Sequence, residues 1–364
     1  MRLETLGEYV ANPIVFKGPD QKPFLAPRGV LMNEKVFAVC DTGQNRVLIW
    51  KNPTEGFSRE PDLILGQSDG AATSRNQGDV ASASTLLYPT SVWCEGDKII
   101  VADAWNHRVL IWNHFPEVNG AAADVVIGQP DFENNQPNVE GMGKAPSAQS
   151  LNWPYGIFCD GQRLWIADTG NRRVLVYNSI PERSYQSADH VIGKPSFDER
   201  DYESDDPIWP YSVKISSKGE LLIADTQFFR VLYWKNWKDA LSSKAEIVFG
   251  QNDLKQSGQN QFLLQPNERC LNWVYDSCFY KNGILINDTG NSRILFFNQI
   301  PDHNNSEAQL VIGRPDFNTS SEYSQTLMGT EKAIYWPFSI GVMGQKLVVA
   351  DTGNHRIVVA DLKF

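Results

Sequence analysis

Residues 164–177 read LWIADTGNRRVLVY: an apolar run that ends in Asp168, a tight polar turn, and a second apolar run opened by Arg173. Five other stretches have the same form, and in every copy the Arg lies five residues after the Asp. A unit that recurs every 57 to 65 residues predicts an array of supersecondary elements. A feature repeated six times is expected to be architecture, so function is expected where the copies differ. The six pairs are Asp41/Arg46, Asp103/Arg108, Asp168/Arg173, Asp225/Arg230, Asp288/Arg293 and Asp351/Arg356.

Each unit holds four short apolar segments that are rich in Val, Ile and aromatic residues. Gly, Asn, Asp and Pro separate them, which is typical of strands joined by turns. In the third unit the segments read WPYGIFC, RLWIAD, RRVLVY and DHVIG. Six units of four antiparallel strands, without any long helical periodicity, predict an all-β fold, a six-bladed β-propeller. We expect residues 1–364 to form this single domain.

The Asp–turn–Arg unit resembles the NHL repeat, whose signature is an apolar strand followed by D-T-G-N-x-R-V. The resemblance spans essentially the whole chain, and segments of the GQPDF type, such as residues 128–132, are similar to those of bacterial NHL proteins. It implies a six-bladed propeller, in agreement with the strand count. It leaves the activity open, because NHL propellers include protein-binding and RNA-binding modules, lyases and sensor domains.

The two ends of the chain complement each other. In the first five units a Gly follows the repeat Asp by 25 residues, but the chain ends at Phe364 before the sixth unit reaches such a segment. The missing segment is found at the other end, where IVFKGPD (residues 14–20) aligns without a gap on IVFGQND (residues 247–253). We therefore predict that residues 13–18 form the outer strand of blade six, which closes the propeller and covers a sheet edge.

The connection from that Gly to the next repeat Asp varies from 32 to 40 residues, and only 24 residues separate Lys17 from Asp41. In an antiparallel blade these long loops lie at the same end as the Asp turns. Long loops on a rigid scaffold commonly carry binding function. The alternative is that they only cover the outer edge of the propeller and bind nothing. The loops lie around residues 68–85, 130–150, 195–207, 252–270 and 315–333.

A second repeated feature stands near the start of the first strand of each blade: three successive positions hold an aromatic residue (Ala26 in blade one), usually a Pro, and then a variable residue. The aromatic residues before the Pro position are Tyr88, Trp153, Trp209, Trp273 and Trp336, and the four Trp residues are expected to pack in the core between blades. The residues after it are expected to line the mouth of the central channel. Such an aromatic funnel suits a small ligand or a peptide anchor. Its predicted ligand-binding residues are Arg28, Thr90, Tyr155, Tyr211, Tyr275 and Phe338.

Blade five departs from the repeat at two polar positions. Asp276 replaces the Gly or Ser of other blades, and Asn287 replaces an Ala or Cys. We add Asp276 to the ligand-binding candidates, and if the chain is an enzyme, Asp276 and Asn287 are its candidate catalytic residues. A buried Asp costs free energy unless it is paired or hydrated. A structural ion pair is therefore the alternative interpretation of Asp276.

Two of the repeated turns carry unexpected aromatic residues. Trp105 stands where Gly is usual, and Phe228 and Phe229 occupy the turn of blade four. Exposed aromatic residues on turns are typical of a partner surface. The alternative is that they pack beneath the neighbouring long loops.

The composition narrows the classes of function. The 33 Lys and Arg residues against 43 acidic residues give a net charge of −10, which disfavours a nucleic-acid partner. Five Cys without a CxxC spacing indicate neither a disulfide framework nor a zinc site. No apolar run is long enough to span a bilayer and MRLETLGEYVANP lacks a signal-peptide core, so the expected location is the cytoplasm.

Evidence for catalysis in the sequence is weak. The five His are scattered, and HxxEH, GxSxG and phosphate-cradling Gly loops are absent from the sequence. The favoured interpretation is a non-enzymatic propeller that recognises a protein, peptide or small ligand through its long-loop face and aromatic funnel. The alternative is a metal-assisted hydrolase or lyase at the same channel mouth. No cofactor, metal site or membrane partner is predicted, and the oligomeric state stays open.

Overall fold

The structure is a computed structural model that describes residue 6 and residues 8–53, 60–200, 207–319 and 333–364. The chain divides into two compact units, Lys17–Pro210 and Met1–Phe16 with Tyr211–Phe364. Each unit contains three four-stranded sheets, which we call blades. The helices of the described residues are short 3-10 turns. Parts of two predicted long loops, 201–206 and 320–332, lie outside the described residues.

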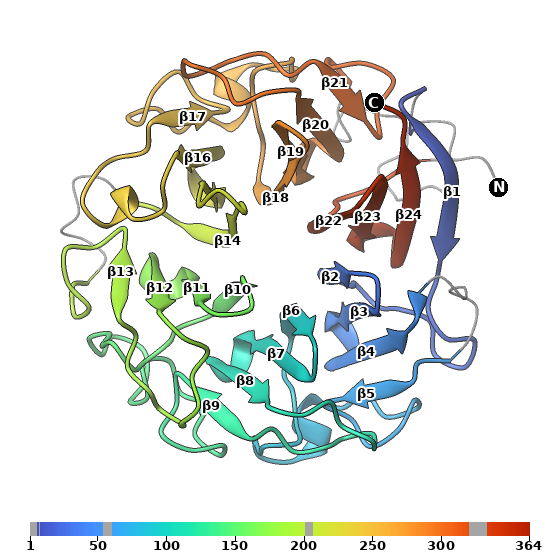
Figure 1. Ribbon diagram of the computed structural model, residues 1–364, viewed down its shortest axis with the longest axis vertical. Helices are drawn as coiled ribbons and strands as arrows, with labels where there is room; N and C mark the ends of the chain where they lie inside the picture. The colour runs from blue at the N-terminus through green and yellow to red at the C-terminus, as the bar shows by residue number, and fades with distance from the viewer. Residues whose placement is uncertain (1–5, 7, 54–59, 201–206, 320–332) are drawn as a thin grey trace. The chain divides into compact units, whose positions relative to one another are not determined.

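The unit Lys17–Pro210 holds blades one to three, each made of four consecutive strands (Figure 1). Blade one contains β2 (Gly29–Met32), β3 (Val36–Asp41), β4 (Arg46–Lys51) and β5 (Leu63–Leu65). Blade two contains β6 (Pro89–Glu95), β7 (Lys98–Asp103), β8 (Arg108–Trp112) and β9 (Val125–Ile127). Blade three contains β10 (Pro154–Cys159), β11 (Leu164–Asp168), β12 (Arg173–Tyr177) and β13 (His190–Ile192).

The other unit holds blades four to six. Blade four contains β14 (Pro210–Ile215), β15 (Leu221–Asp225), β16 (Arg230–Trp234) and β17 (Ile247–Phe249). Blade five contains β18 (Val274–Tyr280), β19 (Gly283–Asp288), β20 (Arg293–Phe297) and β21 (Leu310–Ile312). Blade six contains β22 (Ser339–Met343), β23 (Lys346–Asp351), β24 (Arg356–Leu362) and, as its fourth strand, β1 (Val10–Phe16).

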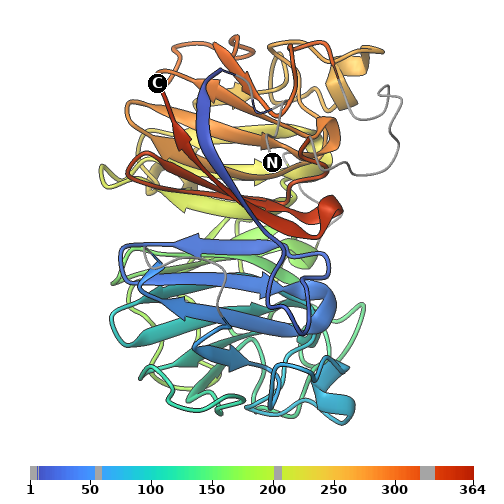
Figure 2. The same ribbon diagram turned by 90° about the vertical axis from the view of Figure 1, so that its right-hand side faces the viewer.

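The predicted six-bladed β-propeller is confirmed, including the completion of blade six by the N-terminal segment. Figure 2 shows β1, in blue, beside β24, in red. The strand lies at 10–16 rather than 13–18, because β24 extends to Leu362 and offers partners to Val10 and Ala11. A register shift between Ala11 and Ile14 accommodates Pro13, which has no N–H to donate.

Six equivalent 3-10 turns connect the second and third strands of the blades. The residue after each turn is left-handed, with φ between 51° and 55°. The turns are η1 (Thr42–Gln44), η4 (Ala104–Asn106), η5 (Thr169–Asn171), η6 (Thr226–Phe228), η9 (Thr289–Asn291) and η10 (Thr352–Asn354). Among the fully described turns, η3 (Arg75–Gly78), η7 (Asp239–Leu241) and η8 (Gln259–Phe262) lie in connections.

The six Asp–Arg pairs are buried architecture, as the repeat indicates. In each pair the Arg Nε donates to the Asp carboxylate over 2.6 to 2.8 Å, and both side chains are at most 2% exposed. In blade one Arg46 also donates to the carbonyl oxygens of Gly70 and Lys22. Each guanidinium of this kind joins its own turn to the loops around it. The hydrogen-bonding groups of the six Asp–Arg pairs are therefore used to fix the turns and loops.

The hydrophobic core lies between neighbouring blades of each unit. One cluster joins strands of blades one and two, and others join blades two and three, four and five, and five and six. The middle strands are buried on both faces; all six residues of β3 are buried, for example. Because both faces of these strands are covered, residues at the blade ends and in loops are the ones that reach a ligand.

Candidate binding site

The predicted ligand-binding residues fall into two groups, one in each compact unit. Arg28, Thr90 and Tyr155 belong to Lys17–Pro210. Tyr211, Tyr275, Asp276 and Phe338 belong to the other unit. All of them lie just before or within the first strand of a blade. The two groups differ in exposure and in chemistry.

The first group is built around Tyr88. The Arg28 guanidinium carbon lies 4.9 Å from the centroid of the Tyr88 ring. The Trp105 ring stacks on the same tyrosine with centroids 4.4 Å apart and an interplanar angle of 19°. The Tyr155 side chain is hydrogen-bonded to Trp105. We call Arg28, Tyr88, Trp105 and Tyr155 the Tyr88 stack.

The Tyr88 stack is partly open to solvent. Trp105 is 39% exposed, and Arg28, Tyr88 and Tyr155 are half-buried. Burial raises the pKa of both Tyr88 and Tyr155, and the charge of Arg28 opposes the shift. The phenols therefore stay protonated near neutral pH. The group presents two phenols, one indole and one fixed positive charge.

Hydrogen bonds that involve backbone groups hold the Tyr88 stack in place. The Trp105 N–H donates to the Leu87 carbonyl over 3.2 Å. The equivalent N–H groups of Gly43 and Gly170 donate to the carbonyl oxygens of Leu25 and Asn152 in the same way. Tyr88 is left-handed, with φ at 58°, and its N–H donates to Asn45 Oδ1 over 3.0 Å. Thr90, another predicted ligand-binding residue, instead donates its hydroxyl to the Tyr155 carbonyl over 2.7 Å. Thr90 thus positions the first strand of the next blade.

The Trp residues before the Pro position contact the preceding blade, as Trp153 does with His107 and Trp273 with Phe229, but the expectation that they are buried in the core is wrong. Trp336 is 48% exposed, and Tyr88, Trp153, Trp209 and Trp273 are half-buried. The core instead uses Trp50, Trp112 and Trp165 of the middle strands. The backbone is left-handed at four of these residues, with φ between 44° and 58°, so their side chains do not follow the in-and-out alternation of a strand. The four are Tyr88, Trp153, Trp273 and Trp336. Sequence reasoning missed Tyr88 as a site residue for this reason.

In three blades the side chain of the left-handed residue after the 3-10 turn accepts a hydrogen bond from the backbone N–H of the aromatic residue before the next blade. Asn45 Oδ1 accepts from Tyr88, and Ser292 Oγ accepts from Trp336, each over 3.0 Å. In blade two the acceptor is His107 Nδ1, 3.0 Å from the Trp153 nitrogen. Burial lowers the pKa of His107 to about 4, and a hydrogen bond with Asn152 opposes this shift. A neutral His107 is needed to accept the Trp153 hydrogen bond.

His107 should make the stability depend on pH. The imidazole of the unfolded chain has a pKa of about 6.5. As the pH falls, the unfolded chain therefore takes up this proton before the folded chain does. The free energy of unfolding present above pH ~6.5 is lost as the pH falls towards ~4. We expect up to about 3 kcal/mol to be lost over this window. In His107→Asn, which copies Asn45, that part of the pH dependence should disappear. Urea unfolding from neutral to acidic pH measures it, and identical pH profiles for the two proteins would contradict this role.

The second group contains three packed aromatic rings. The Tyr211 and Tyr275 centroids are 4.4 Å apart and the Tyr275 and Phe338 centroids 4.2 Å apart. Tyr211 and Phe338 are each 8% exposed, whereas Tyr275 is half-buried. These rings join blades four, five and six, and they offer less open surface than the Tyr88 stack.

Asp276 takes part in a buried ion pair. Its Oδ1 lies 3.2 Å from Lys214 Nζ, and its Oδ2 accepts hydrogen bonds from Ser339 Oγ (2.9 Å) and the Ile340 N–H (3.0 Å). The Asp276 side chain is 3% exposed. The carboxylate thus ties β18 to β14 and β22, and the arrangement is that of a structural pair. Sequence reasoning missed Lys214, although a Lys inside the apolar strand PYSVKI was a visible signal.

Asn287, the other polar departure of blade five, is fully buried opposite Asp276 in the β18–β19 register. Its Nδ2 donates to the Pro337 carbonyl over 2.9 Å. Thr289 Oγ1 donates to the same oxygen over 2.6 Å. Asn287 therefore links blade five to blade six.

The predicted partner-surface residues have different surroundings. Trp105 belongs to the Tyr88 stack. Phe228 is half-buried, with the Arg230 guanidinium carbon 4.8 Å from its ring centroid. Phe229 is half-buried too, and its ring packs edge-on against Trp273 with centroids 5.2 Å apart. Of the three, Trp105 is the most exposed.

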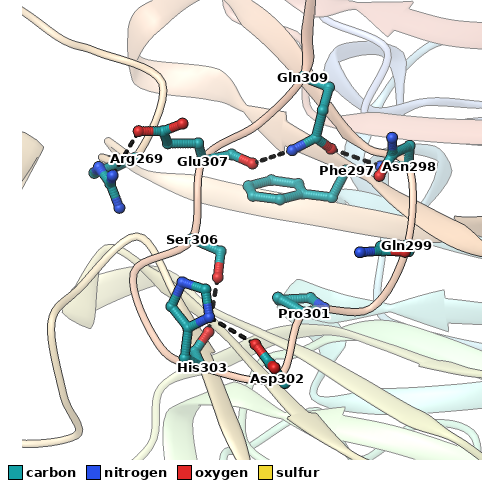
Figure 3. A pocket seen from close by; sticks show the side chains of 10 residues that line it. All are labelled: Arg269, Phe297, Asn298, Gln299, Pro301, Asp302, His303, Ser306, Glu307 and Gln309. Carbon is teal, nitrogen blue, oxygen red and sulfur yellow. Dashed lines mark hydrogen bonds and ion pairs between the residues drawn. The ribbon is translucent and has the colours of Figure 1, made fainter.

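A pocket of about 250 Å³ lies at the β20–β21 connection (Figure 3). The Phe297 ring lies among polar side chains there, and His303 Nδ1 lies 2.7 Å from Asp302 Oδ1. None of the residues predicted from the sequence lines it. Across the described residues, no three His, Cys, Asp or Glu side chains are grouped so as to hold a metal ion. Within the same part of the chain, no helix is long and apolar enough to cross a membrane.

Comparisons with known proteins give a sequence relative and structural relatives. The human protein named NHL repeat-containing protein 2 is 22% identical over 367 residues, which cover 94% of this chain and 47% of that protein. The chain thus spans about half the length of this curated relative. No family model matches the chain.

Two solved lyase structures are similar at low identity. Virginiamycin B lyase from Staphylococcus aureus is 9% identical with a TM-score of 0.46, and the match covers 96% of this chain and 98% of the lyase. A streptogramin B lyase is 11% identical with a TM-score of 0.49, and the match covers 98% of this chain and 100% of the lyase.

Proposed function

This chain is an NHL-repeat protein, and we propose that it is a non-enzymatic binding propeller that takes up a protein or peptide at the Tyr88 stack. The observation that carries the proposal is the exposed Trp105 indole stacked on Tyr88 beside Arg28. Trp, Tyr and Arg are the residue types that dominate binding energy at protein interfaces. All three residue types occur together in the Tyr88 stack, at positions where the blades differ from one another.

The exposure of the group supports a polypeptide rather than a small molecule. Small-ligand sites are concave and bury most of the ligand surface. The Trp105 side chain instead presents 39% of its surface to solvent. Its ring is already held by Tyr88 and Tyr155, so a partner loses little side-chain entropy when it covers the indole.

The alternative, a hydrolase or lyase centred on Asp276, gains less support from the contacts. A general base must reach a substrate proton directly or through one water. Both oxygens of Asp276 already have partners, and the side chain is 3% exposed. Asn287 is fully buried and bonded to the backbone of the next blade.

A selection experiment tests the proposed function. Random peptides displayed on phage are selected on the wild-type protein and counter-selected on Trp105→Ala. We expect enriched peptides that bind the wild type and not the variant. Trp336→Ala is the matched control, because Trp336 is a 48% exposed indole that stacks on Tyr335. Peptides that bind the wild type and Trp105→Ala equally, or that depend on Trp336 instead, would refute the assignment.

A further inference from the structure

The positive charge of the Tyr88 stack belongs to Arg28, whose backbone is fixed by blades one and two. The Arg28 N–H donates to the Cys40 carbonyl in β3 over 3.1 Å. The next residue, Gly29, lies so close to blade two that a Cβ there would be 2.5 Å from the Thr90 carbonyl oxygen. Figure 1 shows the two strands concerned, β2 and β6, side by side. This close packing places the Arg28 side chain against the Tyr88 ring.

The Tyr88 stack is rich in hydrogen-bond donors. The Arg28 guanidinium has five N–H donors and no acceptor. An indole is also only a donor, so Trp105 donates in its hydrogen bond with Tyr155 and the phenol oxygen accepts. Burial raises the pKa of Tyr88 and of Tyr155, so both phenols keep their hydrogens at neutral pH. A partner group that only accepts hydrogen bonds fits this set best.

An ionised carboxylate is such a group. It accepts hydrogen bonds through both oxygens, and bonds from a charged donor are stronger than those between neutral groups. A Lys or Arg side chain of a partner would instead bring only donors and a charge of the same sign as Arg28. The stack therefore favours an acidic side chain over a basic one.

The local charge around Arg28 differs from the net charge of the chain. Residues 17–28, which lead into β2, contain three basic residues and one acidic residue, Asp20. The carboxylates of Asp41 and Asp103, in the repeat turns of blades one and two, are buried and each is paired with its repeat Arg. Repulsion from exposed carboxylates farther away is screened beyond about 10 Å at 0.1 M salt. An acidic partner can therefore approach this part of an otherwise acidic chain.

We propose that the polypeptide bound at the Tyr88 stack is acidic: an Asp or Glu side chain of the partner binds Arg28, and an adjacent apolar side chain covers the Trp105 indole. This inference rests on the proposed function and adds the chemistry of the partner. Trp105 provides the apolar contact area, whereas Arg28 selects the charge of the segment that makes the contact.

Two parallel selections from one phage library of random peptides test the proposal, one on the wild type and one on Arg28→Glu. Peptides enriched on the wild type should contain Asp or Glu beside an apolar residue. Peptides enriched on Arg28→Glu should contain Lys or Arg, because a reversed charge reverses the preference. Arg28→Gln, which removes the charge without reversing it, is selected as well and should lose the preference for acidic peptides.

Affinities of the selected peptides measure the contribution of the charge. The peptides are synthesised with amidated C-termini, so that a carboxylate that binds Arg28 belongs to a side chain. The tightest wild-type peptide should bind Arg28→Glu at least about thirty-fold more weakly. Replacing its Asp or Glu with Asn or Gln should weaken binding to the wild type about ten-fold.

Arg75→Glu is the matched control. Arg75 is an exposed residue of η3 outside the Tyr88 stack, and its replacement changes the net charge of the chain by the same amount. Its effect on peptide affinity should stay below about three-fold, as expected for a screened surface charge. Unchanged melting temperatures of the variants establish that they are folded.

Each contrary result has a separate meaning. Peptides that depend on Trp105 but lack acidic residues, or that bind Arg28→Glu as well as the wild type, would overturn this inference and leave the proposed function intact. An equal loss of affinity in Arg75→Glu would also overturn it, since the effect would then come from net charge. A library without any Trp105-dependent peptide would overturn both. A single-stranded oligonucleotide that binds the wild type, but neither Trp105→Ala nor Arg28→Gln, would assign the stack to nucleic acid instead.

Discussion

Replacing Arg46 with Ala should lower the free energy of unfolding by about 3–5 kcal/mol, the cost of leaving a buried charge without its partner. Arg46 Nε donates to Asp41 over 2.8 Å, and both side chains are fully buried. Burial raises the pKa of Asp41, and the Arg46 guanidinium is the largest opposing influence. The variant also leaves the carbonyl oxygens of Gly70 and Lys22 without these donors. Urea unfolding monitored by tryptophan fluorescence measures the loss.

Arg163→Ala is the control for the Arg46 variant. Arg163 lies 3.1 Å from Asp160, but the two side chains are 34% and 29% exposed. An ion pair accessible to solvent contributes about 0–1 kcal/mol. If Arg46→Ala were as mild as Arg163→Ala, the repeated Asp–Arg pair would not be the structural element described here.

Deleting residues 1–18 should destabilise the protein by a similar amount. The deletion removes β1, whose Val10 and Phe16 are 8% and 7% exposed. Burial of two such side chains contributes about 3–6 kcal/mol. It also exposes the edge of β24, which offers unpaired backbone groups to other chains. We expect a lower melting temperature and increased aggregation on heating.

Ile14→Ser provides the comparison within the same strand. Ile14 pairs with Val359 but its side chain is 47% exposed. Its replacement should change the free energy of unfolding by about 0.5 kcal/mol or less. A truncated protein that melts at the wild-type temperature would show that β1 does not complete blade six in solution.

The fold could be predicted because its signals are local and repeated. The five-residue step from Asp168 to Arg173 spans one turn, and the same contact recurs in every blade. The alignment of residues 14–20 on 247–253 identified β1 without any knowledge of three-dimensional contacts. The exact span of β1 was missed, since it depends on the length of β24 and on the irregular backbone at Asn12, where φ is 49°.

The site was harder to predict, because its contacts join loops far apart in the sequence. Arg28, Tyr88 and Trp105 come from three connections, and the stack requires a left-handed Tyr88, which residue propensities do not predict. Asp276 was recognised as a departure from the repeat, and the sequence left open whether it is paired. Its partner Lys214 lies in the preceding blade. Only the packing of β14 against β18 brings the two together.

The central claim is that the exceptions to the repeat bind a partner while the repeat itself holds the fold. Calorimetric titration tests it most directly, with the phage-selected peptide that binds the wild type most tightly. The peptide is titrated into the wild type and into Trp105→Ala, and the melting temperatures of both proteins are measured as well. We predict a dissociation constant at least about thirty-fold higher for the variant, as for an interface hot spot, and an unchanged melting temperature. Equal dissociation constants, or a loss of binding that accompanies unfolding, would contradict the account.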